Sequence, residues 1–369
     1  MLYFDHNATS PLSPAAREAW LDATARFIGN PSSPHRLGDR ADRALAQARE
    51  RLAGWLGCAA ETIVWTSGAT ESNNTAVAHF AAAGDGEAWV SAVEHPCVLA
   101  AVRRHFAGRH RLIPVRRDGI VEVDWLRAEF SKLRPAFVGA MAANNETGVL
   151  QPWREVLALC RENGVPFFCD AAQWIGKLPA RGLGESDAVS GCAHKFGGPP
   201  GVGFLKAPAR LRPLIVGGPQ EDGRRAGTEN VPGVLAMIAA LAERESAGDA
   251  VGEKIAMRAR FEAELCAALP GIEIVGAGAE RLWNTASAIM PEIDCRQRWV
   301  VKLDKLGFAV STGSACASGK EEPSHVLAAM GFTPAQAARV LRFSSGWETR
   351  AADWSALRDG LVRAVRELA

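Results

Sequence analysis

This 369-residue sequence lacks an excess of charge of either sign: 42 Lys and Arg residues face 41 Asp and Glu residues. A protein that binds nucleic acid or an anionic membrane surface usually carries a basic excess, so we expect neither partner. No run approaches the roughly 18 apolar residues of a membrane span. The opening residues "MLYFDHNATSPLSP" have no basic and apolar leader pattern. We therefore expect no signal peptide and a cytoplasmic protein.

The eight cysteines form no CxxC pair and are scattered along the chain. A zinc site or a disulfide framework is therefore not expected, and we expect no metal. Hydrophobic residues make up 48% of the chain and charged residues 22%. This composition and length suit a globular protein with two cores.

Seven apolar segments alternate with helical patterns and predict the strands of one sheet. These segments are residues 62–68, 88–95, 110–116, 136–145, 165–173, 187–195 and 201–207. Helices are expected over residues 14–55, with an interruption at 29–35, and over 71–83, 97–106, 123–133 and 153–164. Apolar strands that alternate with helices predict an α/β fold with a mostly parallel sheet covered on both faces.

The pattern changes after about Asp249. Long helices are expected over residues 251–269 and 351–368, with short strands over 271–276 and 286–293 between them. We predict a large domain at residues 13–249. The extended arm 1–12 and residues 250–369 would form a smaller α+β domain.

Four motifs fall where ligands bind in parallel sheets, beyond the carboxyl ends of the strands. "TSGATESNN" (66–74) leads from a strand into a helix whose backbone N–H groups suit an anion, although Thr70 could simply cap that helix. His95 follows a strand and precedes a helix, and a lone histidine in such a place is more often structural than functional. Asp170 ends an apolar strand, where a carboxylate needs an arginine or another cation, such as a pyridinium.

The fourth motif is "SGCAHKFGGPPGVGF" (190–204), in which Lys195 precedes glycines and prolines that restrict the backbone. It could be a surface lysine in a glycine loop. Alternatively, an immobilised and desolvated amine is a nucleophile for carbonyl groups. An anion seat, a carboxylate in an apolar pocket, a histidine and such an amine are the parts that bind pyridoxal 5′-phosphate (PLP).

The chain resembles the NifS/IscS-type cysteine desulfurases, which are fold-type I PLP enzymes of the class V aminotransferase superfamily. Motifs throughout its length carry the resemblance: "DHNATSPL", "GNPSSPH", "TSGATESNN", "EHPCVL", "NNETGVLQP", "DAAQWIGK", "HKFGGPPGVG", "GRRAGTEN", "STGSACAS" and "LRFSSG". The resemblance implies a large domain with a seven-stranded sheet and a homodimer. It also implies conversion of L-cysteine to L-alanine, with the sulfur passing to a cysteine of the enzyme and then to an acceptor protein.

The resemblance also implies roles for individual residues. Lys195 would bind PLP as the Schiff-base lysine, and His95 would stack on the ring and relay protons. Asp170 would pair with the pyridine nitrogen. The other cofactor contacts would be Ala69, Thr70, Asn145, Gln173 and His194, with Thr228 reaching the phosphate of the neighbouring subunit.

Arg342 would bind the substrate carboxylate beside Asn145, since a guanidinium binds a carboxylate in a bidentate way. Cys316 would accept the sulfur as a persulfide. The small polar residues around it, from Thr312 to Glu322, predict a mobile loop, although an inert cysteine is the alternative. Cys192 stands where the family usually has serine, which leaves one phosphate contact in question because a thiol is a weak donor.

The resemblance leaves rivals open. The chain could be a selenocysteine lyase or another class V PLP aminotransferase. A sulfur-relay scaffold without activity is the non-enzymatic alternative.

Overall fold

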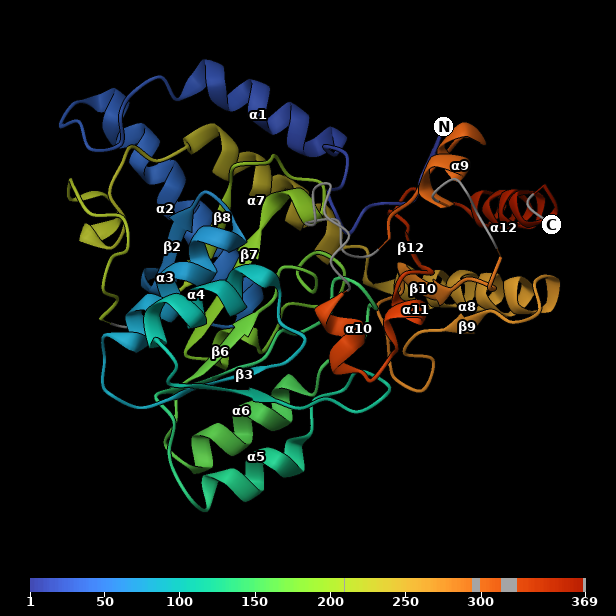
Figure 1. Cartoon of the computed structure of the whole chain (residues 1–369). Coiled ribbons are helices and arrows are strands. Elements are labelled where there is room, and N and C mark those ends of the chain that lie inside the picture. Colours follow the sequence, from blue (N-terminus) through green and yellow to red (C-terminus); the bar gives the residue numbers. More distant parts are fainter. Residues whose placement is uncertain (209, 294–298, 313–323, 368–369) are drawn as a thin grey trace.

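The computed structural model describes residues 1–208, 210–293, 299–312 and 324–367. Figure 1 shows a larger part, in blue to yellow, beside a smaller part, in orange and red. The larger part contains a seven-stranded sheet with the strand order β2-β8-β7-β6-β5-β3-β4. The strands are β2 (Ile63–Thr66), β3 (Ala88–Ser91), β4 (His110–Ile113), β5 (Phe137–Gly139), β6 (Phe167–Asp170), β7 (Ala188–Cys192) and β8 (Gly203–Lys206).

One strand, β8, runs antiparallel to both of its neighbours, β2 and β7. The pairs β7–β6, β6–β5, β5–β3 and β3–β4 are parallel. Six strands therefore share one direction, and their carboxyl ends meet at one edge of the sheet. The mostly parallel seven-stranded α/β sheet expected from the sequence is confirmed.

Successive side chains along a strand point to opposite faces of the sheet, so they pack into two different hydrophobic clusters. Trp65 and Trp89 belong to one hydrophobic cluster, whereas Val64 and Val90 belong to another. The first cluster takes residues from the helices α1, α2, α5, α6 and α7, and the second takes them from α3 and α4. These helices are α1 (Pro14–Arg26), α2 (Arg36–Leu56), α3 (Ala69–Ala81), α4 (Pro96–Phe106), α5 (Val123–Phe130), α6 (Trp153–Glu162) and α7 (Val231–Glu245).

Helix α7 was not expected from the sequence. Its residues are buried on most sides because it packs against both α1 and α2. The segment "VPGVLAMIAALAERE" is consequently apolar almost all round and shows little helical periodicity.

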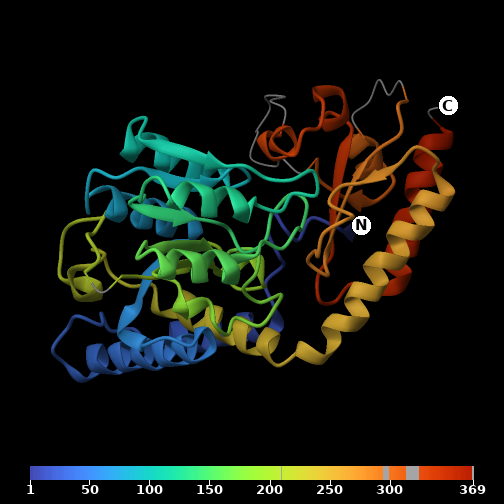
Figure 2. The same ribbon diagram turned by 90° about the horizontal axis from the view of Figure 1, so that it is seen from below.

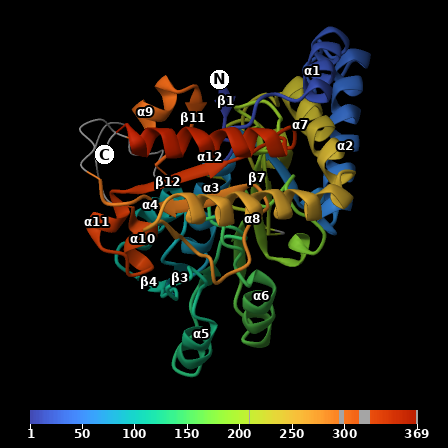
Figure 3. The same ribbon diagram turned by 90° about the vertical axis from the view of Figure 1, so that its right-hand side faces the viewer.

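The smaller part has a three-stranded antiparallel sheet in the order β12-β10-β9. Its strands are β9 (Glu273–Ile274), β10 (Thr285–Ile289) and β12 (Val340–Ser344), and its helices are α8 (Val251–Ala268), α9 (Trp299–Lys305), α10 (His325–Ala329), α11 (Pro334–Ala337) and α12 (Ala351–Arg366). Helix α8 leads out of the larger part in Figure 2, and Figure 3 shows it beside α12. A separate core, which includes Phe261, Phe343 and Trp354, lies between these helices and the sheet.

The N-terminal arm joins the smaller part. Strand β1 (Leu2–Tyr3) pairs in parallel with β11 (Phe308–Ala309), and Asp5 forms a bridge to Ser344 of β12. Phe4 lies in the core of the smaller part. On these contacts we propose that residues 1–12 and 250–369 form the small domain and residues 13–249 the large one.

Candidate active site

The carboxyl edge of the large sheet opens into a cavity of about 880 Å³. Residues of the N-terminal arm and of the small sheet also line it. Nine residues predicted from the sequence share its lining: Ala69, Thr70, His95, Asn145, Asp170, Gln173, His194, Lys195 and Arg342. The structure thus brings together side chains from positions 69 to 342, and their individual roles stay predictions.

Asp170 ends β6 and is 4% exposed. Its Oδ2 accepts a hydrogen bond from Asn73 Nδ2 at 2.7 Å, and its Oδ1 accepts one from the backbone N–H of Ala172 at 3.0 Å. Both oxygens of this buried carboxylate therefore have a hydrogen-bond donor. Asn73 lies in the motif "TSGATESNN", but its role was not foreseen, because only the fold places it against Asp170.

Helix α3 begins at the cavity. Its N-cap residue is Gly68, and no side chain caps the helix. The alternative that Thr70 caps this helix is therefore wrong. A Cβ on Gly203 of β8 would come within 2.6 Å of Gly68 Cα, so glycine at 203 lets the turn lie on the sheet. The Ala69 N–H hydrogen-bonds the Cys192 sulfur, and the next backbone N–H groups of the first turn suit an anion such as a phosphate.

Lys195 lies on a 3₁₀ turn (Ala193–Lys195) directly after β7. Its Nζ donates to the carbonyl oxygens of Asn7, at 2.6 Å, and of Ala8, at 2.7 Å. The turn is tight: a Cβ on Gly198 would lie 2.7 Å from that of Ala193. The glycines after Lys195 therefore hold its backbone in place, and the arm holds its amine.

A second lysine lies behind the cavity. Lys177 is 4% exposed, and its Nζ donates to Asn7 Oδ1 at 2.8 Å and to Gln173 Oε1. Gln173 Nε2 in turn donates to the carbonyl oxygen of Asn7 at 3.0 Å. Burial lowers the pKa of Lys177 well below its usual range, and the charges of Lys195 and Arg342 lower it further. Lys177 stands in the quoted "DAAQWIGK", but nothing in the sequence marked it as buried.

Two histidines of the cavity are partly desolvated. Burial lowers the pKa of His95, with a smaller opposing effect from the charge of Asp170. Burial and the nearby Lys195 charge lower the pKa of His194 to about 4. His194 Nδ1 lies 3.3 Å from the hydroxyl of Thr9. Both rings are therefore neutral near pH 7 and can donate and accept hydrogen bonds.

Arg342 extends from β12 to the cavity and is 1% exposed. Its Nη1 donates to the carbonyl oxygen of Asn145 at 2.9 Å, and its Nη2 donates to Asp5 Oδ1 at 2.6 Å. Asp5 belongs to the N-terminal arm, so a contact across 337 positions fixes this guanidinium. The sequence did not reveal the role of Asp5.

Cys192 also lines the cavity and is 2% exposed. Burial raises the pKa of its thiol to about 11, although the Lys195 charge opposes this rise. The thiol is thus protonated at neutral pH: its sulfur accepts from the backbone N–H of Ala69, and its own hydrogen is a weak donor.

Two predicted residues are not placed in the cavity. Thr228 is exposed and is not among the residues that line it, but Arg225, three positions earlier, forms an ion pair with Glu71 at 2.9 Å. The loop of Thr228 is thereby tied to the first turn of α3. Cys316 and its loop lie outside the described residues.

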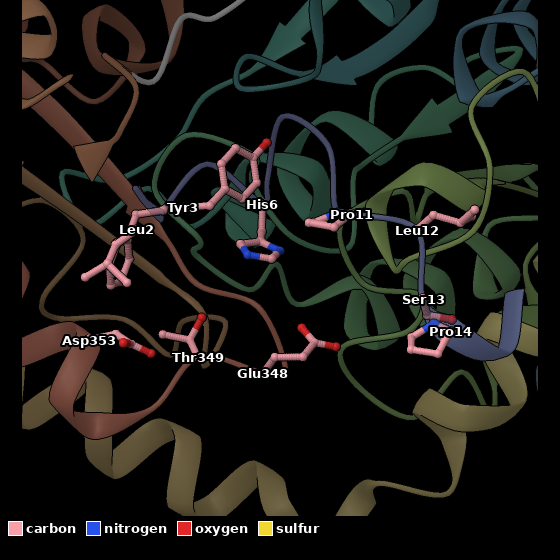
Figure 4. A pocket seen from close by; sticks show the side chains of 11 residues that line it. Leu2, Tyr3, His6, Pro11, Leu12, Ser13, Pro14, Glu348, Thr349 and Asp353 are labelled. Atoms are coloured by element: carbon pink, nitrogen blue, oxygen red, sulfur yellow. The ribbon is translucent and has the colours of Figure 1, made fainter. Parts of the chain in front are cut away.

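A second, smaller hollow of about 320 Å³ lies away from these residues. Figure 4 shows that its side chains come from the N-terminal arm on one side and from Glu348, Thr349 and Asp353 on the other. His6 is common to this hollow and to a small space behind Lys195.

Among the described residues, no group of three or more His, Cys, Asp or Glu side chains is arranged to hold a metal ion. Within the same residues, every helix is too short or too polar to cross a membrane.

The chain belongs to the aminotransferase class-V family, whose model matches residues 2–357. A cysteine desulfurase of Gluconacetobacter diazotrophicus is 38% identical over 380 residues, which cover 100% of this chain and 94% of that protein. The solved structure of a NifS-like protein from Rickettsia africae has a TM-score of 0.89 at 28% identity and covers 99% of both chains. The structure titled "SspA in complex with cysteine" has a TM-score of 0.81 at 29% identity, over 93% of this chain and 98% of that one.

Proteins of this family use PLP. The donor set of the cavity fits this cofactor: the uncapped start of α3 suits the phosphate, the Asp170 carboxylate suits a pyridinium nitrogen, and the Lys195 amine suits the carbonyl. The anion site, at the start of α3 after β2, and Asp170, at the end of β6, lie at the same edge of the sheet. The fold thus holds the groups that the cofactor needs in one cavity.

Proposed function

We propose that this protein is a PLP-dependent cysteine desulfurase, which converts L-cysteine to L-alanine and transfers the sulfur to Cys316 as a persulfide. One observation carries the proposal: Lys195, Asp170 and the uncapped start of α3 line the same cavity as Arg342. The curated relatives named cysteine desulfurase support it. So does the similar protein whose title states that it is in complex with cysteine.

The overall reaction balances without a further reactant. The carbon–sulfur bond of cysteine breaks, and a sulfur–sulfur bond to Cys316 forms. Of the two thiol hydrogens, one ends on the persulfide and the other on the methyl group of alanine. The protein must therefore move protons to and from carbon.

PLP, when bound, withdraws electrons from the α-carbon of the substrate. Lys195 would hold the cofactor through Nζ, Asp170 would keep the pyridine nitrogen protonated, and the first turn of α3 would hold the phosphate.

Other side chains would bind the substrate and carry its protons. Arg342, which Asp5 and Asn145 hold in place, would bind the substrate carboxylate as a planar fork. His95 and Lys195 would carry the protons, since a neutral imidazole and an amine can both give and take one. Cys316 as a thiolate would attack the substrate sulfur.

The function is tested with purified protein, L-cysteine and a reducing thiol. The account predicts alanine and sulfide in equal amounts, and neither product from the Lys195→Ala variant. Borohydride should fix the cofactor to the wild type but not to this variant. A preference for selenocysteine, or amino-group transfer without sulfide, would indicate one of the rival PLP enzymes. A colourless protein without turnover would indicate a scaffold.

We further propose a homodimer in which Thr228 completes the phosphate site of the partner. The support is that Thr228 is exposed near a run of exposed apolar residues, Leu214, Ile215 and Val216. A second copy of the chain would cover this surface. We also propose that the protein works in the cytoplasm, where thiols stay reduced, and that an acceptor protein takes the sulfur from Cys316.

A further inference from the structure

A chain of hydrogen bonds runs from Asp170 to His95 through Asn73 and Cys97. Asn73 Nδ2 lies 2.7 Å from Asp170 Oδ2 and 3.2 Å from Cys97 Sγ. An ionised carboxylate only accepts hydrogen bonds, so the amide of Asn73 must turn its nitrogen toward Asp170. The two hydrogens of that nitrogen then serve the carboxylate and the sulfur. Cys97 Sγ is therefore an acceptor toward Asn73, and its own hydrogen is not used there.

A second neighbour of the Cys97 sulfur is His95. Sγ lies 2.9 Å from His95 Nδ1, and the backbone N–H of Cys97 donates to the same Nδ1 at 3.2 Å. A backbone N–H can only donate, so Nδ1 of the neutral ring carries no hydrogen. The Thr70 side chain also hydrogen-bonds Sγ and lowers the pKa of the thiol, as a donor to the sulfur does. With Asn73 and Thr70 both donating to Sγ, the thiol hydrogen lies between Sγ and Nδ1.

The thiol is suited to this role because it keeps its proton. Burial raises the pKa of Cys97 to about 12, and the Asp170 charge adds to the rise. A protonated thiol is a donor and a poor nucleophile, which separates Cys97 from a sulfur-accepting cysteine. Among the charged groups that face His95, Asp170 raises its pKa, whereas Lys195 and His325 lower it.

We propose that Cys97 is a positioning residue that holds neutral His95 in the Nε2–H tautomer. The inference rests on the proposed function, in which His95 exchanges protons with the substrate. The two donors at Nδ1, the thiol and the backbone N–H, leave Nε2 as the only ring nitrogen with a hydrogen. Through Asn73, the same chain ties the orientation of His95 to the carboxylate of Asp170.

The tautomer is measured by ¹⁵N NMR of protein with labelled histidine, without cofactor and with it. The chain has eight histidines, and the His95→Gln variant identifies the signals of His95. We expect a pure Nε2–H pattern in the wild type. In Cys97→Ala only the longer backbone N–H bond to Nδ1 remains, so the Nδ1–H form should rise to a measurable fraction, and the titration midpoint of His95 should move to higher pH. Cys97→Ser, which keeps a hydrogen-bond donor, should restore the Nε2–H tautomer and the titration midpoint of His95. Cys266→Ala, at an exposed position, should change neither the tautomer nor the midpoint.

Kinetics give an independent readout. Cys97→Ala should lower kcat severalfold with little change in KM for cysteine, and Cys97→Ser should recover most of the loss. A wild-type ring with its hydrogen on Nδ1, or an unchanged tautomer and titration in Cys97→Ala, would overturn the proposal. Both results can be measured by NMR on cofactor-free protein and do not depend on alanine formation. Failure of this proposal would therefore be distinguishable from failure of the proposed function.

Discussion

Lys195 Nζ lies 2.6 Å from the carbonyl oxygen of Asn7, a residue of the N-terminal arm 188 positions earlier. The side chain of Asn7 also connects the two parts of the molecule: its Nδ2 donates to Thr285 Oγ1 at 2.8 Å, and its Oδ1 accepts from Lys177 and Asn284. Asn7 thus links the amine of Lys195, through its backbone carbonyl, to Thr285 of the small sheet, through its side chain.

Asn7→Ala should therefore lower stability more than a surface change does. It leaves the donors of Lys177 and Asn284 without one acceptor in the interior, and each such group costs about 1–3 kcal/mol. We expect a melting temperature several degrees lower and weaker PLP retention, both measured on the purified variant. Asn30→Ala, at an exposed asparagine, is the matched control. Equal melting temperatures of the two variants would show that the hydrogen bonds of the Asn7 side chain do not stabilise the fold.

Arg342→Lys tests the carboxylate site. Lysine keeps the charge but loses the planar fork that binds two oxygens. KM for cysteine should rise about tenfold or more, since roughly 1.4 kcal/mol of binding energy is a factor of ten. The change in kcat should be smaller, because the reacting atoms are not touched. Steady-state kinetics measure both, and an unchanged KM would exclude Arg342 as the substrate anchor.

Glu94 makes stability depend on pH. It is fully buried, its Oε1 accepts from the Met141 backbone at 2.6 Å, and its Oε2 has no hydrogen-bond partner among the described residues. Burial, and then the charge of Asp170, raise its pKa from 4.5 to about 8. Above pH 4.5 the unfolded chain loses this proton while the folded protein keeps it. Stability should therefore fall as the pH rises from 4.5 to 8.

Glu94→Gln removes this titration and keeps the acceptor for Met141. At pH 7 to 8 the variant should be more stable than the wild type by roughly 1–3 kcal/mol, and near pH 4 the difference should vanish. Thermal unfolding across this pH range measures it, with exposed Glu50→Gln as the control. A constant difference at every pH would mean that Glu94 is ionised in the folded protein.

The order of the strands and of most helices was predictable because these elements have local patterns, whereas the apolar helix α7 does not. The ends of β3, β6 and β7 could therefore be placed at one edge, which is why His95, Asp170 and Lys195 could be expected to line one cavity. The hydrogen-bond partners of these side chains that come from other segments could not be predicted. Asp5 reaches Arg342 across 337 positions, and Asn73 reaches Asp170 across 97. Such contacts depend on how the sheet and the arm pack, and no local sequence pattern predicts them.

The dimer can be tested by mixing two inactive variants. If Thr228 serves the partner subunit, Lys195→Ala and Thr228→Glu should each have little activity alone. A mixed dimer holds one site with both the native Lys195 and the partner's native Thr228. Co-refolding or co-expression of the two variants should therefore restore part of the activity. If Thr228 serves its own subunit, every site in the mixture keeps one defect and activity stays absent.

The central claim is sulfur transfer from cysteine to Cys316, and mass spectrometry of the peptide that carries Cys316 tests it most directly. After one turnover with L-cysteine and no added thiol, the account predicts a gain of one sulfur atom on this peptide and one alanine released per modified cysteine. The Cys316→Ser variant should retain the cofactor and bind cysteine, yet show neither the added sulfur nor the matching alanine. Alanine and sulfide formed at the wild-type rate by this variant would contradict the account.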